Sequence, residues 1–218
     1  MSKELQTRLL SSFILIPISF YFVLKGSYLF IYFLLFCFVV TAYEWHMMTK
    51  KKKYQFFGFL FLIFSFYSTY AVRNNFNEES LTFFIIILIT CISTDIGGYI
   101  FGKIFKGPKL TKISPKKTYA GVFGGYFLSI INLNFFFNYI SSYNKIFIKS
   151  NIELFLIILL ISTVSQIGDV VISYFKRLSK IKDTGKLIPG HGGLLDRIDG
   201  MIFAFPFSYA IISFNIFK

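Results

Sequence analysis

The chain consists largely of apolar runs that are long enough to cross a membrane. Of its 218 residues, 55% are hydrophobic and 21% are aromatic, which is too apolar for an ordinary soluble domain. A transmembrane helix needs about 20 mostly apolar residues. Segments near that length occupy residues 9–24, 28–45, 54–72, 81–101, 119–140, 152–175 and 198–217. The sequence therefore predicts an all-α integral membrane protein, a polytopic bundle of about seven transmembrane helices.

The distribution of basic residues predicts how the chain crosses the membrane. With the N-terminus in the cytoplasm, the cytoplasmic segments contain 18 of the 23 Lys and Arg residues, and the outer segments contain five. Because cytoplasmic loops are enriched in Lys and Arg, we expect a cytoplasmic N-terminus and an outer C-terminus. Two long polar segments, residues 102–118 and 176–197, then both face the cytoplasm. Residues 9–24 should remain as a helix, since no convincing small-residue cleavage site follows them.

Aspartates are scarce, and most of them gather at one place. The chain has five, of which four lie between residues 169 and 199. Asp169 falls on a polar stripe at helical spacing within the sixth apolar span, together with Ser162, Gln166, Ser173 and Lys176. Hydrogen bonding between helices accounts for the Ser and Gln side chains. An ionised carboxylate at the centre of a membrane helix costs about 2.5–3.5 kcal/mol on insertion scales, so we favour a functional role for Asp169 and note Asp95 in the fourth span.

Two further aspartates extend this cluster into a candidate metal site. Asp196 and Asp199 are three residues apart, so on a helix their carboxylates would share a face. Either one alone could cap a helix, but with Asp169 they favour a divalent cation, and hard oxygen ligands suit Mg²⁺. The neighbouring basic residues favour a polyanionic substrate; they are Lys176, Arg177, Lys182, Lys186 and Arg197. Acids for a metal beside bases for phosphate indicate phosphoryl or nucleotidyl transfer.

Two loops that contain glycine could approach such a substrate closely. Residues 188–193, which include His191, Gly192 and Gly193, have the composition of a tight turn, because glycine allows positive φ and a close approach of phosphate. Residues 102–125 contain six lysines and the sequence Ser-Pro-Lys-Lys-Thr. This second loop either binds phosphate or carries its lysines only for topology, and the sequence leaves both interpretations open.

These residues resemble the signature of the phosphatidate cytidylyltransferases, also called CDP-diacylglycerol synthases. The resemblance follows the family's order and spacing through Ser173, Lys176, Arg177, Lys182, Asp183, Gly185, Ile188, Pro189, His191, Gly192, Gly193, Asp196, Arg197 and Asp199. It extends to residues 165–169, 97–103 and 114–118, to the Arg8-Leu9 start, and to Tyr43-Glu44-Trp45 at the end of the second span. The similarity therefore covers both ends of the chain.

The resemblance implies an activity, a location and a set of ligands. Such an enzyme makes CDP-diacylglycerol and pyrophosphate from CTP and phosphatidate in the bacterial inner membrane, with its site on the cytoplasmic side. By resemblance, Asp169 and Asp196 hold a two-cation centre with Mg²⁺, and a monovalent ion such as K⁺ is left open as the second cation. We accordingly divide the chain into N-terminal transmembrane helices (residues 1–80) and a catalytic region (residues 81–218). Nucleic acid is not an expected partner, and a homodimer is left open.

The resemblance also suggests roles for individual side chains. The candidates for catalysis are Asp169, Asp196, Asp199, His191, Lys176 and Arg177. We expect Lys176, Arg177, Lys182 and Arg197 to bind phosphates. His191 either donates to the leaving pyrophosphate or orders the glycine turn, Asp199 either binds metal or orients Arg197, and Asp183 orders its loop. The other candidates for substrate binding are Gly192, Gly193, Ser114, Lys116, Lys117 and Asp95.

The chain also departs from the family pattern. Ile96 follows Asp95 where most relatives have a small hydroxyl residue, and Tyr119 stands where Trp is frequent. Only residues 73–80 join the third and fourth spans, where many members have a longer membrane region. The main alternative is a membrane cation transporter that uses Asp95 and Asp169. A CDP-alcohol phosphatidyltransferase would need a motif that this chain lacks, and a non-catalytic scaffold would tolerate substitution of its aspartates.

Overall fold

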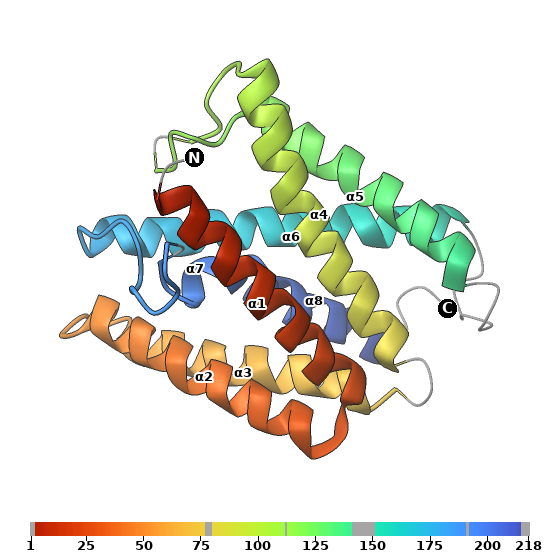
Figure 1. The fold of residues 1–218 in the computed structure, drawn as a ribbon, viewed down its shortest axis with the longest axis horizontal. Helices are drawn as coiled ribbons and strands as arrows, with labels where there is room; N and C mark the ends of the chain where they lie inside the picture. The colour runs from red at the N-terminus through yellow and green to blue at the C-terminus, as the bar shows by residue number, and fades with distance from the viewer. Residues whose placement is uncertain (1–2, 77–79, 112, 141–150, 191, 215–218) are drawn as a thin grey trace. The chain divides into compact units, whose positions relative to one another are not determined.

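The computed structural model describes residues 3–76, 80–111, 113–140, 151–190 and 192–214. All the regular elements in these residues are helices (Figure 1), which are α1 (Lys3–Lys25), α2 (Ser27–Thr49), α3 (Gln55–Asn74), α4 (Ser80–Phe105), α5 (Tyr119–Ile140), α6 (Asn151–Leu178), α7 (Leu195–Ile198) and α8 (Met201–Ser213). Isolated β-bridges join Lys109 to Thr118 and Ile188 to Gly192. The predicted all-α class is confirmed.

Several of these helices suit a bilayer. Within the described ranges, α2, α3, α4 and the part of α6 from Ile152 onward are long and apolar enough to cross a membrane. Shorter apolar helical stretches occupy Phe13–Lys25 and Met201–Ser213. A helix satisfies its backbone hydrogen bonds internally, as the hydrocarbon core requires, so the chain is a multi-pass membrane protein. The predicted count of seven crossings and the predicted orientation stay predictions.

The final apolar span differs from the sequence prediction. We expected one helix over residues 198–217, but the helical chain is interrupted at Asp199 and Gly200, between α7 and α8. Asp199 Oδ1 accepts the backbone N–H of Gly200 at 2.9 Å. A side chain that takes a backbone donor in this way competes with helical hydrogen bonding. Asp196 and Asp199 therefore do not share one helix, and the prediction of a common helical face is wrong.

Two compact units make up the chain. The first comprises residues 1–70 and 175–198, and the second comprises residues 71–174 and 199–218. Residues 179–194, which we call the signature loop, therefore group with the N-terminal helices. The division at residue 80 concerned function, and it stays a prediction.

In the first unit, α2 and α3 lie side by side (Figure 1) and meet tightly near the turn that joins them. Trp45 Nε1 donates to the carbonyl oxygen of Gln55 at 3.0 Å, and a Cβ at Gly58 would lie 2.0 Å from the Trp45 ring. Trp45 also packs edge-on against Phe175 at the end of α6, with ring centroids 5.2 Å apart. These contacts anchor the end of α6 beside the end of α2.

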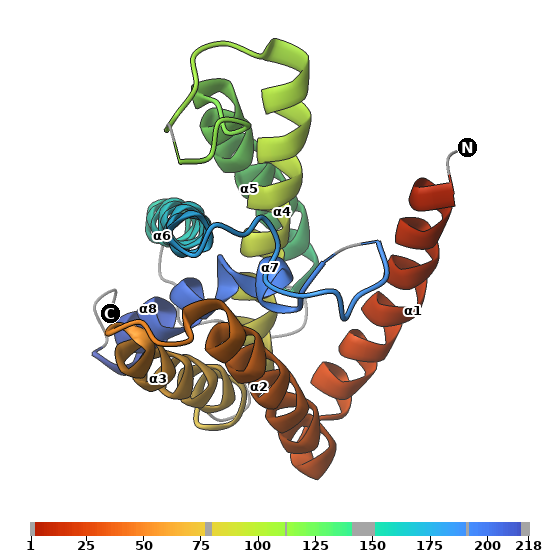
Figure 2. The same cartoon turned by 90° about the vertical axis from the view of Figure 1, so that its left-hand side faces the viewer.

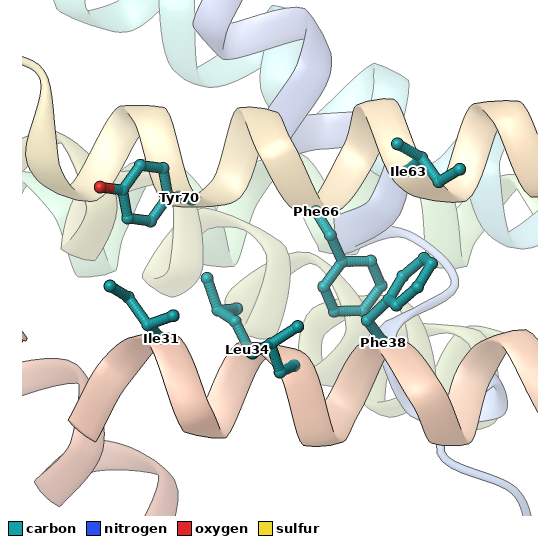
Figure 3. Close-up of a pocket in the computed structure, with 7 residues that line it drawn as sticks. Ile31, Leu34, Phe38, Ile63, Phe66 and Tyr70 are labelled. Atoms are coloured by element: carbon teal, nitrogen blue, oxygen red, sulfur yellow. The ribbon is translucent and has the colours of Figure 1, made fainter. Parts of the chain in front are cut away.

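Further along α2 and α3, the two helices leave an apolar groove of about 270 Å³ (Figure 3). Its walls are Ile31, Leu34, Leu35 and Phe38 of α2, with Ile63, Phe66 and Tyr70 of α3. The groove contains no charged lining residue, so it has the character of a surface that faces lipid rather than a polar substrate.

In the second unit, α4 and α5 lie against each other (Figure 2), and glycines line their contact. A Cβ at Gly97 would lie 2.2 Å from the carbonyl oxygen of Gly124, and one at Gly124 would lie 2.2 Å from the Phe101 Cβ. Small residues allow membrane helices to approach this closely, and van der Waals packing then holds them together.

Polar side chains join α6 to the same pair of helices. Thr94 of α4 donates to Ser162 of α6 at 2.8 Å, and the hydroxyls of Tyr126 and Thr163 lie 2.9 Å apart. Ser162 therefore serves helix–helix hydrogen bonding, as its position on the predicted stripe suggested.

The glycine contact between α4 and α5 gives a matched stability prediction. Gly97→Ala should lower the free energy of unfolding by about 1–3 kcal/mol, because the new methyl group overlaps the α5 backbone. Gly98→Ala is the control, since its Cβ would be 3.6 Å from the Gly121 carbonyl oxygen, an ordinary contact. Thermal unfolding in detergent measures both variants, and equal melting temperatures would contradict the packing described.

Candidate active site

The signature loop begins at a well-formed helix end. Lys180 has a positive φ of 57°. The N–H of Ile181 donates to the carbonyl oxygen of Lys176 at 3.0 Å, and the N–H of Lys180 donates to the carbonyl oxygen of Arg177 at 3.0 Å. This pair of bonds is a Schellman motif, which satisfies carbonyl groups left over at a helix end. Arg177 Nη1 also donates to the Ile181 carbonyl oxygen at 3.0 Å. The direction in which the loop leaves α6 is thus fixed.

Asp196 lies at the centre of the loop's hydrogen bonds. Its Oδ1 accepts Lys176 Nζ at 2.8 Å, and the two side chains are only 8% and 10% exposed. Its Oδ2 accepts the Thr184 N–H at 2.7 Å and the Gly193 N–H at 3.1 Å. The Thr184 hydroxyl oxygen lies 3.0 Å from the same Oδ2, and its single proton is shared between this oxygen and Glu44. A buried carboxylate needs this many donors to replace water. Asp196 and Lys176, both sequence candidates, are therefore brought together.

A second buried carboxylate, Glu44 at the end of α2, binds the same loop. Glu44 is 4% exposed. Its Oε1 accepts the Leu194 N–H at 2.9 Å, and its Oε2 accepts the Leu195 N–H at 2.8 Å and lies 3.0 Å from the Thr184 hydroxyl oxygen. Sequence reasoning gave Glu44 no role beyond its part in the family resemblance. Its signal was that it is the one acidic residue in the apolar span 28–45.

Glycines make room for these carboxylates. A Cβ at Gly185 would lie 2.6 Å from Glu44 Oε1, and one at Gly193 would lie 2.2 Å from Thr184 Oγ1 and 2.6 Å from Glu44 Oε2. Gly192 has a positive φ of 90°, as a turn glycine often does. The sequence suggested that glycines in residues 188–193 admit a phosphate. Gly193 of that turn instead lies against a protein carboxylate, as does Gly185, which precedes the turn.

The second unit contains the other predicted metal ligand, Asp169. Its Oδ2 forms an ion pair with Lys117 Nζ, and its Oδ1 accepts the Ser173 hydroxyl at 3.4 Å. The Asp169 side chain is 28% exposed and that of Lys117 is 24% exposed, so the pair remains open to solvent.

Local hydrogen bonds present Lys117 to α6. The Lys117 N–H bonds to the Ser114 carbonyl oxygen at 3.0 Å, and the Leu110 N–H bonds to the Lys117 carbonyl oxygen at 2.8 Å. Thr118 caps α5, because its Oγ1 accepts the Gly121 N–H at 3.1 Å. The loop over residues 102–118 thus delivers a lysine to a site aspartate, which favours a role beyond topology.

The remaining candidates are buried to different degrees. Asp199 is 8% exposed and bonds to Gly200. His191 lies outside the described residues. Exposed candidates are Asp95, Lys116, Arg177, Lys182, Asp183 and Arg197. The basic residues among these candidates are therefore exposed, whereas Lys176 and Lys117 are each held against a carboxylate.

The carboxylates suit Mg²⁺ by their chemistry. No group of three or more His, Cys, Asp or Glu side chains forms a metal-binding cluster in the part of the chain that the structure describes. Mg²⁺ commonly takes one or two carboxylates and fills its other positions with water and phosphate. Oδ1 of Asp169 and Oδ1 of Asp196 each accept one bond from the described residues. Each of these oxygens therefore retains acceptor capacity for a cation.

Fold and site together define a helical membrane protein in which carboxylates and lysines are paired at polar loops. The model of the cytidylyltransferase family matches residues 55–215. Phosphatidate cytidylyltransferase of Rickettsia bellii is 34% identical over 96% of this chain and 91% of its own length, and that of Rickettsia felis is 33% identical over 96% and 92%. The enzyme of that name from Staphylococcus epidermidis is 33% identical over 78% of this chain and 64% of its own length. The chain belongs to the phosphatidate cytidylyltransferase family.

The different surroundings of the two aspartates predict different effects on stability. Asp196→Asn should lower the free energy of unfolding by about 3–5 kcal/mol, because it leaves the buried Lys176 charge without its partner. Asp169→Asn should change it by less than about 1 kcal/mol, because its ion pair is partly exposed. Thermal or denaturant unfolding of the purified variants compares them. Equal losses would show that Asp196 does not organise the loop.

Proposed function

We propose that this chain makes CDP-diacylglycerol and pyrophosphate from CTP and phosphatidate. The observation that carries the proposal is its membership of the phosphatidate cytidylyltransferase family over nearly its whole length. A phosphate oxygen of phosphatidate attacks the α-phosphorus of CTP, and the bond from that phosphorus to pyrophosphate breaks. The lipid phosphate is already ionised, so the attack needs little help from a general base.

The main role of the site residues is to bind and neutralise the negative charges of the substrate phosphates. The reaction gathers the phosphates of two anionic substrates, and catalysis of phosphoryl transfer is mostly positioning and electrostatic stabilisation. Lys176 and Lys117 each lie against a carboxylate. We assign them to the substrate phosphates, and the exposed Arg177, Lys182, Arg197 and Lys116 to the attraction of CTP.

Asp169 and Asp196 are the proposed Mg²⁺ ligands. When bound, Mg²⁺ neutralises charge on the phosphates and orients them. The Oδ1 atom of each aspartate retains acceptor capacity for a cation. A monovalent ion such as K⁺ is the candidate for a second cation. His191 either donates to pyrophosphate or orders its turn, while Asp199 and Asp183 are assigned to local order.

We further propose seven crossings with a cytoplasmic N-terminus in the bacterial inner membrane. The supporting observation is the excess of Lys and Arg in the segments assigned to the cytoplasm, 18 of 23. This orientation brings both long polar segments, residues 102–118 and 176–197, to the cytoplasmic side, where CTP is available. Phosphatidate reaches the site from the membrane leaflet.

The activity is tested with purified protein, radiolabelled CTP, phosphatidate and Mg²⁺, by following the label that enters the lipid phase.

In the same assay, Asp169→Asn should lower kcat about 100-fold or more, because it removes a charge that acts on the transition state. Lys117→Gln should lower kcat about 10-fold or more. Lys116→Gln is the matched neighbour: because Lys116 is assigned to the attraction of CTP, it should change kcat by less than about threefold and act instead on the CTP concentration for half-maximal rate. No labelled lipid from well-folded wild-type protein would refute the proposal.

The topology is tested with single cysteines after replacement of Cys37 and Cys91. Cysteines at Thr111 and Lys186 should react with a membrane-impermeant reagent only after the cytoplasmic side is opened, whereas one at Asn75 should react in intact cells. Labelling of position 111 or 186 from outside would reverse the orientation.

A further inference from the structure

We propose that Glu44 is a positioning residue for this reaction: it holds the signature loop from α2 and, through Thr184, fixes the carboxylate of Asp196. The inference rests on the proposed function for its catalytic consequence, and on the contacts of the first unit for its geometry. Glu44 does not need to touch either substrate in order to act in this way.

The Glu44 carboxylate binds both arms of the loop. Thr184 precedes the turn that the Ile188–Gly192 bridge closes, and Leu194 and Leu195 follow it. All three donors lie 2.8–3.0 Å from Glu44 oxygens. One side chain on α2 therefore ties both arms to that helix, in addition to the link between the arms through Asp196, which bonds to Thr184 and Gly193.

Thr184 connects this carboxylate to Asp196. Its hydroxyl oxygen lies 3.0 Å from Glu44 Oε2 and 3.0 Å from Asp196 Oδ2, and its N–H bonds to the same Asp196 oxygen at 2.7 Å. Any displacement of Thr184 changes contacts to both acids. Because the other Asp196 oxygen bonds to Lys176, rotation of the Asp196 carboxylate also moves the lysine assigned to phosphate.

Burial and close approach show that the loop is shaped around a carboxylate at this point. Glu44 is 4% exposed, and Gly185 and Gly193 leave space that a methyl group would fill. A buried charge is expensive and is retained only with partners that compensate it. Partners that orient a metal-binding carboxylate typically affect metal affinity or activity by about 10- to 100-fold when removed.

Glu44→Gln is the test variant, because it preserves size but replaces one acceptor oxygen with an NH₂ group. The first readout is limited trypsin cleavage of the full chain in detergent after Lys182 and Lys186, which are exposed in the loop, with cleavage after Lys50–Lys53 as an internal standard. We expect cleavage in the loop to accelerate several-fold and cleavage at the standard to stay constant. We also expect kcat to fall about 10- to 100-fold and the Mg²⁺ concentration for half-maximal rate to rise.

Two control substitutions separate positioning from general stability. Thr41→Val alters another buried polar residue of α2, whose hydroxyl bonds only to carbonyls of its own helix, Cys37 and Phe38. It should match the wild type in both readouts. Thr184→Ser keeps the hydroxyl between the two acids and should retain most activity, whereas Thr184→Val should reproduce much of the Glu44→Gln loss.

Each result decides the inference. The inference is overturned if Glu44→Gln is cleaved in the loop at the wild-type rate, or if cleavage accelerates equally at the loop and at the standard. It is also overturned if loop cleavage accelerates while kcat and the Mg²⁺ dependence stay at wild-type values. If wild-type protein makes no CDP-diacylglycerol, the proposed function fails and the catalytic role with it, while the cleavage comparison still decides whether Glu44 holds the loop.

Discussion

Buried carboxylates, and the donors that they require, organise the polar part of this membrane protein. Removing an ionised group from water costs several kcal/mol, which nearby hydrogen bonds and opposite charges must offset. For Glu44 and Asp196 most of those donors are backbone N–H groups of residues 184 and 193–195. The loop's shape and the charges of the acids therefore depend on each other. Polar backbone with little regular structure can persist beside apolar helices because the acids replace its water.

Each of the two predicted metal ligands forms an ion pair with a lysine, but the two pairs differ in burial. Asp196 is paired with Lys176 in a buried setting, and Asp169 is paired with Lys117 in a more open one. A lysine that leaves its carboxylate for a phosphate exchanges one anion for another. Under the proposed function, such an exchange frees the carboxylate for a cation, whose positive charge would offset that of the incoming phosphates.

Sequence pattern predicted the fold class and the positions of most helices, because an apolar helix depends on residues that are close together in the sequence. The fifth span was expected at residues 119–140 and α5 occupies Tyr119–Ile140. The break at Gly200 escaped prediction, since hydropathy marks an apolar span but not the residue at which its helix begins, and the Asp199 side chain takes the Gly200 N–H. The helix ends at Phe105 and Leu178 also extend beyond their predicted limits into polar sequence.

The sequence suggested which residues belong to the candidate site, but not which hydrogen bonds connect them. Spacing identified Asp169, Asp196 and the basic residues, and it explained Ser162 as a helix contact. It could not pair Glu44 with Leu195, which is 151 positions away. The family model begins at residue 55, after Glu44. A chain cut to the region that the family model matches would keep the signature loop and lose the acceptor for Leu194 and Leu195, so that region by itself lacks a contact on which the shape of the loop depends.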